Sequence, residues 1–508
     1  MSIAKKVASQ SGWFLVGNLY TLFVGFTFQI YLARQIGAEG LGLFGLLQTG
    51  VGIFSSLLGL GIAQVMLRFI PEHVAKREYA ELYALVWSGS LLIAVSSLFG
   101  VIVVLCAMPW MLQYWPLLVG QKSVVMAGIL MLPLSLILYV TNEALRGFCD
   151  IRYIVIGGSF LQLTIKVISS VVVFSLGYMV VGYVWAVVFS LLVALIWMQV
   201  GLWHHLGQYP SPHRVSLHLL PAWKSYAKLM YGNSLIGFLA APLQRFLVVS
   251  VGGVAAVGVL MVASTLYQLP GMFHRMFLSI VAPMVAAANS TGNRAEVYKV
   301  YHLATDWVVR LATPLIIFLF VYAQPVLALF GQQFSDDGAI LLMLLVFTQF
   351  LNLIAGPIGN VLNMCGQERK LFVISVVSIV LNALLLLALV PHWGLPGVGI
   401  VILVVTLFSN LSALVVAWRS IGLWWWSKRY THWILPSIVT TVLSLVVRHF
   451  LPTSPYVLAV CLGVMYVGFH GVFILVHGFN EDDREVVRAI LKKLPLRVAW
   501  LERVILKL

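Results

Sequence analysis

Long apolar segments recur along the whole chain and limit it to a membrane fold. A helix needs about 20 predominantly apolar residues to cross the hydrocarbon core of a bilayer. The 508 residues hold fourteen such segments, which begin near Ser11, Leu41, Ala80, Ser123, Ile151, Val180, Lys228, Val254, Leu303, Gly338, Leu371, Gly397, Trp433 and Tyr456. With 61% hydrophobic and 9% charged residues, the composition excludes an ordinary soluble globular protein. We therefore predict an all-α integral membrane protein with 14 transmembrane helices.

The connections between these segments are too short to hold a soluble catalytic domain. The four cysteines lie singly, without the spacing of a metal site or a disulfide framework. The sequence has no Gly-rich nucleotide loop followed by Lys and Ser or Thr, so we expect no ATPase activity of its own. We predict a transporter without cofactors, not an enzyme.

The net charge of +15 is distributed as in a membrane protein, not as in a nucleic-acid binder. If the N-terminus is inside, most of the 31 Lys and Arg residues fall in cytoplasmic segments, and Arg34, Lys122 and Arg448 fall outside. This asymmetry follows the positive-inside rule. We expect a multi-pass protein of the bacterial inner membrane with both termini cytoplasmic and with no nucleic-acid partner.

The two halves of the chain resemble each other. Gly37 and Gly42 recur as Gly253 and Gly258 at an offset of 216 residues, and Gly177 recurs as Gly394 at an offset of 217. Two distant blocks with nearly one offset indicate an internal repeat of six spans. An even number of spans gives both copies the same orientation, as in transporters whose halves rock about a central site.

The repeat predicts five parts, with two six-helix lobes in parallel repeat and two extra C-terminal helices. These are an N-lobe at 1–203, a cytoplasmic linker at 204–227, a C-lobe at 228–420, spans thirteen and fourteen at 421–479, and an amphipathic cytoplasmic tail at 480–508.

Polar residues form stripes at helical spacing within four spans. Each stripe lies on one helix face, because residues three and four positions apart are neighbours. They hold the candidate substrate-binding residues Asn18, Gln29, Gln162, Gln268, Asn352 and Asn360. The alternative is helix-to-helix contact, which small and polar residues mediate generally in membranes.

Two of these stripes carry a cation deep in the membrane. Lys166 lies in the fifth span and Arg275 in the eighth, and neither has a carboxylate on its own helix. A charge at mid-bilayer costs roughly 2.5 to 3.5 kcal/mol on insertion scales, so it usually faces a wet cavity or a partner. A net-positive cavity fits an anionic cargo, and Arg can bind phosphate with a fork of donors.

Two further cations are secondary candidates. Arg245 lies near the outer end of its span and could instead be an interfacial anchor. Arg310 lies four residues after Asp306 and could instead form a local ion pair.

The sequence also resembles a known family. The stretch from Leu32 to Phe44, LARQIGAEGLGLF, and the stretch from Arg68 to Glu72, RFIPE, are similar to bacterial polysaccharide flippases of the Wzx type. These belong to the superfamily of the lipid II flippase and the multidrug and toxin extrusion transporters.

The resemblance implies a flippase that moves an undecaprenyl-pyrophosphate-linked oligosaccharide from the inner to the outer leaflet by alternating access. Its partners would be that polyisoprenoid-linked glycan, the bilayer, and a polysaccharide polymerase with its chain-length machinery, in O-antigen or exopolysaccharide export. The alternatives are a multidrug or cation antiporter and a lipid II-type flippase. A membrane glycosyltransferase or polymerase would need a larger external loop than the one near Arg34 to Gly40.

Overall fold

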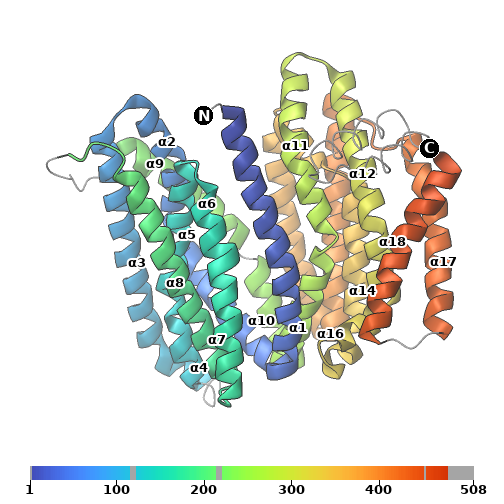
Figure 1. Cartoon of the computed structure of the whole chain (residues 1–508), viewed down its shortest axis with the longest axis horizontal. Coiled ribbons are helices and arrows are strands. Elements are labelled where there is room, and N and C mark those ends of the chain that lie inside the picture. The colour runs from blue at the N-terminus through green and yellow to red at the C-terminus, as the bar shows by residue number, and fades with distance from the viewer. Residues whose placement is uncertain (1–2, 115–121, 213–219, 239, 451–453, 479–508) are drawn as a thin grey trace. The chain divides into compact units, whose positions relative to one another are not determined.

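The computed structural model describes residues 3–114, 122–212, 220–238, 240–450 and 454–478, and these residues form helices without strands (Figure 1). The first half contains α1 (Ile3–Leu58), α2 (Ile62–Lys76), α3 (Tyr79–Tyr114), α4 (Lys122–Ile129), α5 (Met131–Gly147), α6 (Ile151–Ile154), the π-helix η2 (Val155–Gln162), α7 (Leu163–Ser175), α8 (Val180–Leu206) and α9 (Pro221–Phe238). The second half contains α10 (Ala240–Gln268), α11 (Gly271–Ser290), α12 (Arg294–Val321), α13 (Ala323–Ala328), α14 (Gln332–Ile354), α15 (Ile358–Met364), α16 (Glu368–Ile421), the 3-10 helix η3 (Lys428–Trp433), α17 (Ile434–Phe450) and α18 (Pro455–His477).

Eleven helical segments among the described residues are long and apolar enough to cross a membrane. Two of the longest helices each contain two of the segments expected from the sequence. The backbone of α1 leaves helical geometry at Gly37, and that of α16 leaves it at Gly394. The all-helical membrane fold is thus confirmed, while the count of fourteen spans stays a prediction.

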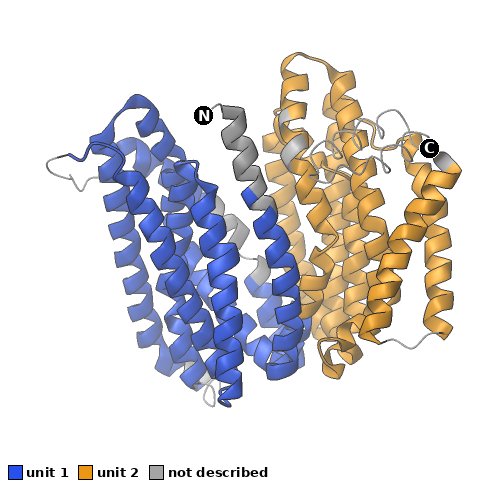
Figure 2. Cartoon of the chain, viewed as in Figure 1, with its two compact units in different colours: residues 1–261 blue, residues 262–508 orange. Residues whose placement is uncertain are grey.

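The chain divides into two compact units, residues 1–261 and 262–508 (Figure 2). The first unit has a core between α2, α3, α5 and α8 that includes Met66, Leu82 and Leu145. In the second unit, Val285, Tyr301 and Leu362 belong to a core of α11, α12, α15 and α16. Large apolar side chains such as Phe99 and Leu384 are exposed, as expected of helices that face lipid.

Glycines that correspond in the repeat adopt corresponding backbone conformations. Gly37 has φ 69° and ψ −176°, and Gly253 has φ 71° and ψ −173°. Gly177 and Gly394 also have positive φ, at 85° and 56°. Positive φ strains any residue with a Cβ, so both copies need glycine here. The conformations support the repeat found in the sequence.

The loop between α5 and α6 is joined to the end of α8 by a buried carboxylate. Asp150 caps α6 by accepting a hydrogen bond from the Arg152 backbone N–H, and it pairs with the Arg152 guanidinium at 3.0 Å and with His205 Nε2 at 3.1 Å. Burial of the carboxyl opposes its ionisation, but hydrogen bonds from His205 and Arg152 outweigh burial and hold its pKa below the usual range. This contact fixes the end of the span that carries Lys166.

The five-part division expected from the sequence stays a prediction. The expected linker at 204–227 lies partly outside the described residues, which omit 213–219. The expected amphipathic tail at 480–508 lies wholly outside them.

Candidate functional site

Lys166 lies half-buried on α7, within the membrane-spanning part of the first unit. Its Nζ lies 5.7 Å from the centroid of the Phe28 ring of α1. A cation over an aromatic face is stabilised by about 0.5 to 2 kcal/mol, less than the cost of placing it in hydrocarbon. Within the described part of the chain, Lys166 forms no ion pair with a carboxylate. The amine therefore remains available to an anion.

Arg245 is held by hydrogen bonds within the same unit. One of its terminal nitrogens donates to the Gly45 carbonyl oxygen at 3.1 Å and to Thr49 Oγ1 at 2.7 Å, both on α1. These two acceptors are uncharged, so the positive charge of the guanidinium is retained. Arg245 is thus a positioned cation on α10, beside α1.

Arg275 lies exposed on α11 in the second unit. A methyl group built on Gly271 would lie 2.9 Å from Gln349 Nε2 and 3.6 Å from an Arg275 terminal nitrogen, so both side chains share the space beside Gly271. The structure thereby brings Arg275 of α11 close to Gln349 of α14, which lies three residues before Asn352 in its helix. Among the residues that the structure describes, Arg275 forms no ion pair.

Arg310 is buried in the second unit and is paired with Asp306 on the same helix, as the i, i+4 spacing predicted. Its guanidinium also lies 4.6 Å from the Phe473 ring centroid and 4.9 Å from that of Trp307. The contact with Phe473 joins α12 to α18, while the contact with Trp307 lies within α12. The pair is neutral as a unit, so Arg310 adds little positive charge to a cavity.

The uncharged candidates fall into different surroundings. Asn352 accepts a hydrogen bond from Asn410 Nδ2 at 3.2 Å, which is the helix-to-helix contact considered as the alternative. Gln268 is exposed and donates to the Ser264 carbonyl oxygen of its own helix. Asn18 is exposed on α1, and Gln29 is half-buried there. Asn360 is half-buried on α15.

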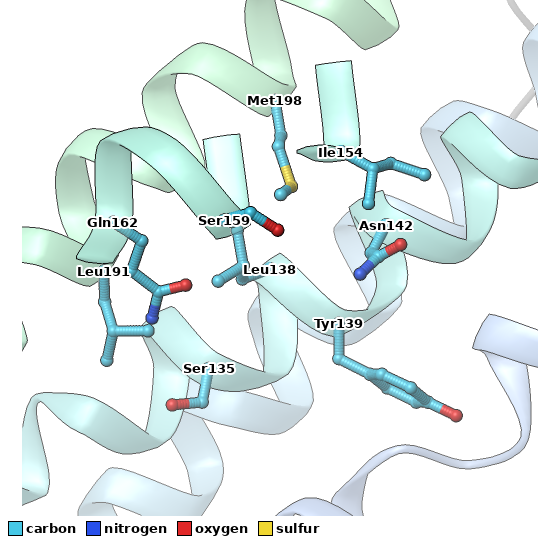
Figure 3. Close-up of a pocket in the computed structure, with 10 residues that line it drawn as sticks. Ser135, Leu138, Tyr139, Asn142, Ile154, Ser159, Gln162, Leu191 and Met198 are labelled. Atoms are coloured by element: carbon cyan, nitrogen blue, oxygen red, sulfur yellow. The ribbon is translucent and has the colours of Figure 1, made fainter. Parts of the chain in front are cut away.

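Gln162 lines a cavity of about 340 Å³ within the first unit (Figure 3). The walls come from α5, from the stretch Ile154 to Gln162 and from α8. The lining residues are Ser135, Leu138, Tyr139, Asn142, Ile154, Gly158, Ser159, Gln162, Leu191 and Met198. The size falls in the range of small-molecule sites, about 300 to 1,000 Å³. None of these ten residues is charged, so the cavity is polar but neutral.

One wall of the cavity is a π-helix. The segment Val155–Gln162 begins close to the adjacent glycines Gly157 and Gly158. Stretches of π-helix are rare and frequently occur at functional sites. Lys166 follows Gln162 by four residues on the α-helical continuation, which places the two side chains on the same face.

The sequence prediction missed the wall contributed by α5. Ser135, Tyr139 and Asn142 have the i, i+4, i+7 spacing of one helix face, the same signal that marked the other stripes. The adjacent glycines ahead of Ser159 were a further signal, because glycine weakens an α-helix.

Residues 31–337 of the chain match the family described as polysaccharide biosynthesis protein. No curated protein sequence matches the chain significantly. The matched range includes the motif from Leu32 to Phe44, the π-helix and both Lys166 and Arg275. It covers more than half of the chain.

Solved structures show the same fold at low sequence identity. The lipid II flippase MurJ in an inward closed conformation has a TM-score of 0.69 and 11% identity, and the match covers 91% of this chain and 99% of that one. An inward-facing multidrug resistance MATE family transporter of the MOP superfamily has a TM-score of 0.64 and 17% identity, with 79% and 94% covered. The MATE multidrug transporter DinF-BH has a TM-score of 0.61 and 17% identity, with 84% and 98% covered.

The family match confirms the resemblance drawn from the residues, and the structural matches give the fold of superfamily members that include both flippases and drug transporters. The chain belongs to the family of polysaccharide biosynthesis proteins.

Proposed function

We propose that this protein is a flippase for a polyprenyl-pyrophosphate-linked oligosaccharide, which it moves from the inner to the outer leaflet by alternating access. The observation that carries the proposal is Lys166, a cation within a membrane span that forms no ion pair with a described carboxylate. Such a charge is expensive unless it serves a ligand. Family membership supplies the glycan context.

Arg275 and Arg245 are the further cations assigned to the pyrophosphate. Arg275 is exposed, and the hydrogen bonds of Arg245 within the described residues go to uncharged oxygens, so each keeps its charge for an incoming anion. Arg310 has a smaller part, because Asp306 already neutralises it. The lipid tail would stay in the bilayer while the charged head group passes the cations.

Multidrug transporters share this fold, so a multidrug or cation antiporter is the alternative function for this chain. A cationic drug would be repelled by unpaired lysine and arginine side chains. Of the described intramembrane carboxylates, Asp306 and Glu143 are each paired with an arginine. The charge of the site therefore favours an anionic cargo.

Reconstitution in proteoliposomes tests this choice. Fluorescent undecaprenyl-pyrophosphate-linked sugar in the outer monolayer of the vesicles should become inaccessible to an added glycosidase or lectin at a rate that rises with protein content. Vesicles without protein give the background rate. A background rate for the lipid-linked sugar, together with protein-dependent uptake of a cationic dye such as rhodamine, would overturn the proposal in favour of the antiporter.

A further inference from the structure

The cavity of the first unit has a polar wall whose hydrogen-bonding groups are unused. Ser135, Asn142, Ser159 and Gln162 all line it, and none of their side chains hydrogen-bonds to another described residue. Tyr139 is the exception at the rim, where its hydroxyl accepts a hydrogen bond from Gln64 Nε2 at 3.3 Å. Inside a membrane protein, such groups usually pair across helices. Here they line a cavity instead.

Asn142 gives the strongest indication of a ligand. Its Oδ1 is fully buried and has no hydrogen-bond partner among the residues that the structure describes. A buried acceptor left unsatisfied costs about 1 to 3 kcal/mol. In Figure 3 the Asn142 amide and the Ser159 hydroxyl extend toward the same space from two different walls. A guest between α5 and the π-helix could therefore bond to both.

The π-helix contributes two polar residues and one glycine to one wall of the cavity. Gly158, Ser159 and Gln162 all belong to Val155–Gln162 and all line the cavity. Gly158 has no side chain to fill the space, and a methyl group built on it would meet only Met198 Cε at 3.7 Å. The absence of a Cβ therefore leaves room beside the two polar residues.

We propose that this cavity is the subsite for a neutral sugar ring of the glycan, the one attached to the pyrophosphate. This inference rests on the proposed function. Serine hydroxyls and carboxamides both donate and accept hydrogen bonds, as a ring bearing several hydroxyls requires. The neutral lining excludes the pyrophosphate itself, and the polar wall disfavours the lipid tail.

The position of Lys166 orders the two parts of the ligand. Lys166 lies four residues beyond Gln162, on the same helix face and about 6 Å further along the axis. A pyrophosphate at Lys166 would thus have its attached sugar at Gln162, Ser159 and Asn142. The exposed ring of Tyr139 offers an apolar face at the rim, where a sugar ring could pack.

Binding measurements with two lipid probes separate the contribution of the sugar to the affinity from that of its carrier lipid. The probes are undecaprenyl pyrophosphate and undecaprenyl-pyrophosphoryl-N-acetylglucosamine, added to the purified full chain in lipid nanodiscs. The wild type should bind the sugar-bearing lipid about 3- to 10-fold more tightly, the worth of one or two net hydrogen bonds. Asn142→Ala and Gln162→Ala should abolish this ratio without changing the affinity for undecaprenyl pyrophosphate. Gln199→Ala removes an amide of the same unit that bonds Thr141 outside the cavity, and it should leave the ratio intact.

The other possible results of these binding measurements would contradict the sugar subsite, and one of them would contradict the proposed function as well. A wild-type ratio near one would mean that the cavity holds water only, and a ratio kept in both variants would place the sugar elsewhere. If neither lipid binds to the wild type, the proposed flippase function is contradicted, and the sugar subsite, which rests on it, is contradicted too. Thermal unfolding measurements check that each variant is folded. Ser135→Ala and Ser159→Ala each remove one hydroxyl and should partly reduce the ratio of the two lipid affinities.

Discussion

Gly42 and Gly258, which correspond in the repeat at an offset of 216 residues, make reciprocal close approaches within the first unit. A methyl group built on Gly42 would lie 1.8 Å from the Val254 carbonyl oxygen, and one built on Gly258 would lie 2.0 Å from the Ala38 carbonyl oxygen. Val254 and Ala38 are themselves separated by 216 residues. Each copy of the predicted repeat thus presents a glycine to the backbone of the other copy.

Alanine at either glycine should destabilise the protein. Overpacking usually costs about 1 to 3 kcal/mol, and here the obstacle is backbone, which cannot turn aside as a side chain can. We expect Gly42→Ala and Gly258→Ala to lower the apparent Tm in detergent. Gly50→Ala is the matched control, because nothing lies within 4 Å of a methyl group at that position of α1. Equal stability of all three variants would show that Gly42 and Gly258 do not lie in close contact with the backbone carbonyls.

The buried pair of Asp306 and Arg310 should behave as a coupled unit. Asp306→Ala leaves the Arg310 charge buried without its carboxylate, which typically costs about 3 to 5 kcal/mol. Replacing both, as Asp306→Leu with Arg310→Met, should cost less than Asp306→Ala alone. Unfolding measurements on Asp306→Leu, Arg310→Met and the double variant form a double-mutant cycle that provides the coupling energy. Simple additivity of the two single variants would contradict the pairing.

The Asp150 contact should contribute a pH-dependent part of stability. The pKa of this carboxyl is lower in the folded chain than its ordinary value of 3.8. Its stabilising effect is therefore complete above about pH 5, one unit above the ordinary pKa, and is lost as the pH falls through the folded-state pKa. The Tm difference between wild type and Asp150→Asn should be largest near neutral pH and shrink below about pH 4. Asp337→Asn, at an exposed carboxyl, should show little difference at any pH.

Membrane potential should influence the transport rate if cations carry the anionic head group. An inside-negative potential is worth about 2.3 kcal/mol per charge per 100 mV, and it favours outward movement of an anion and inward return of an empty cationic site. Imposing a potassium diffusion potential with valinomycin should therefore change the flipping rate in proteoliposomes according to its sign. Flipping rates that do not change with the imposed potential would exclude this driving force.

Periodicity and charge predicted a large part of the molecule. The spacing of Gly37 and Gly253 predicted a repeat, and the positive φ that they share supports it. The ion pair of Arg310 with Asp306 is the alternative that the i, i+4 spacing offered. The cavity could not be predicted from the sequence, because it depends on the distance between α5 and α8 and on a π-helical stretch. Helical periodicity read at 3.6 residues per turn does not anticipate such a stretch. Lys166 could be singled out from the sequence because a charge deep in an apolar span is costly, and its role in binding stays a prediction.

Replacing one cation in each unit tests directly whether these side chains bind the pyrophosphate. Lys166→Gln combined with Arg275→Gln removes two positive charges and keeps polar side chains. Because hydrogen bonds to charged groups are worth about 1.5 to 3 kcal/mol, we expect flipping of undecaprenyl-pyrophosphate-linked sugar in proteoliposomes to fall at least about tenfold. Arg294→Gln with Lys428→Gln changes two exposed cations at the ends of spans and should leave the rate unchanged. A double variant at Lys166 and Arg275 that inserts normally and flips the lipid-linked sugar at the wild-type rate would show that these cations do not serve the pyrophosphate.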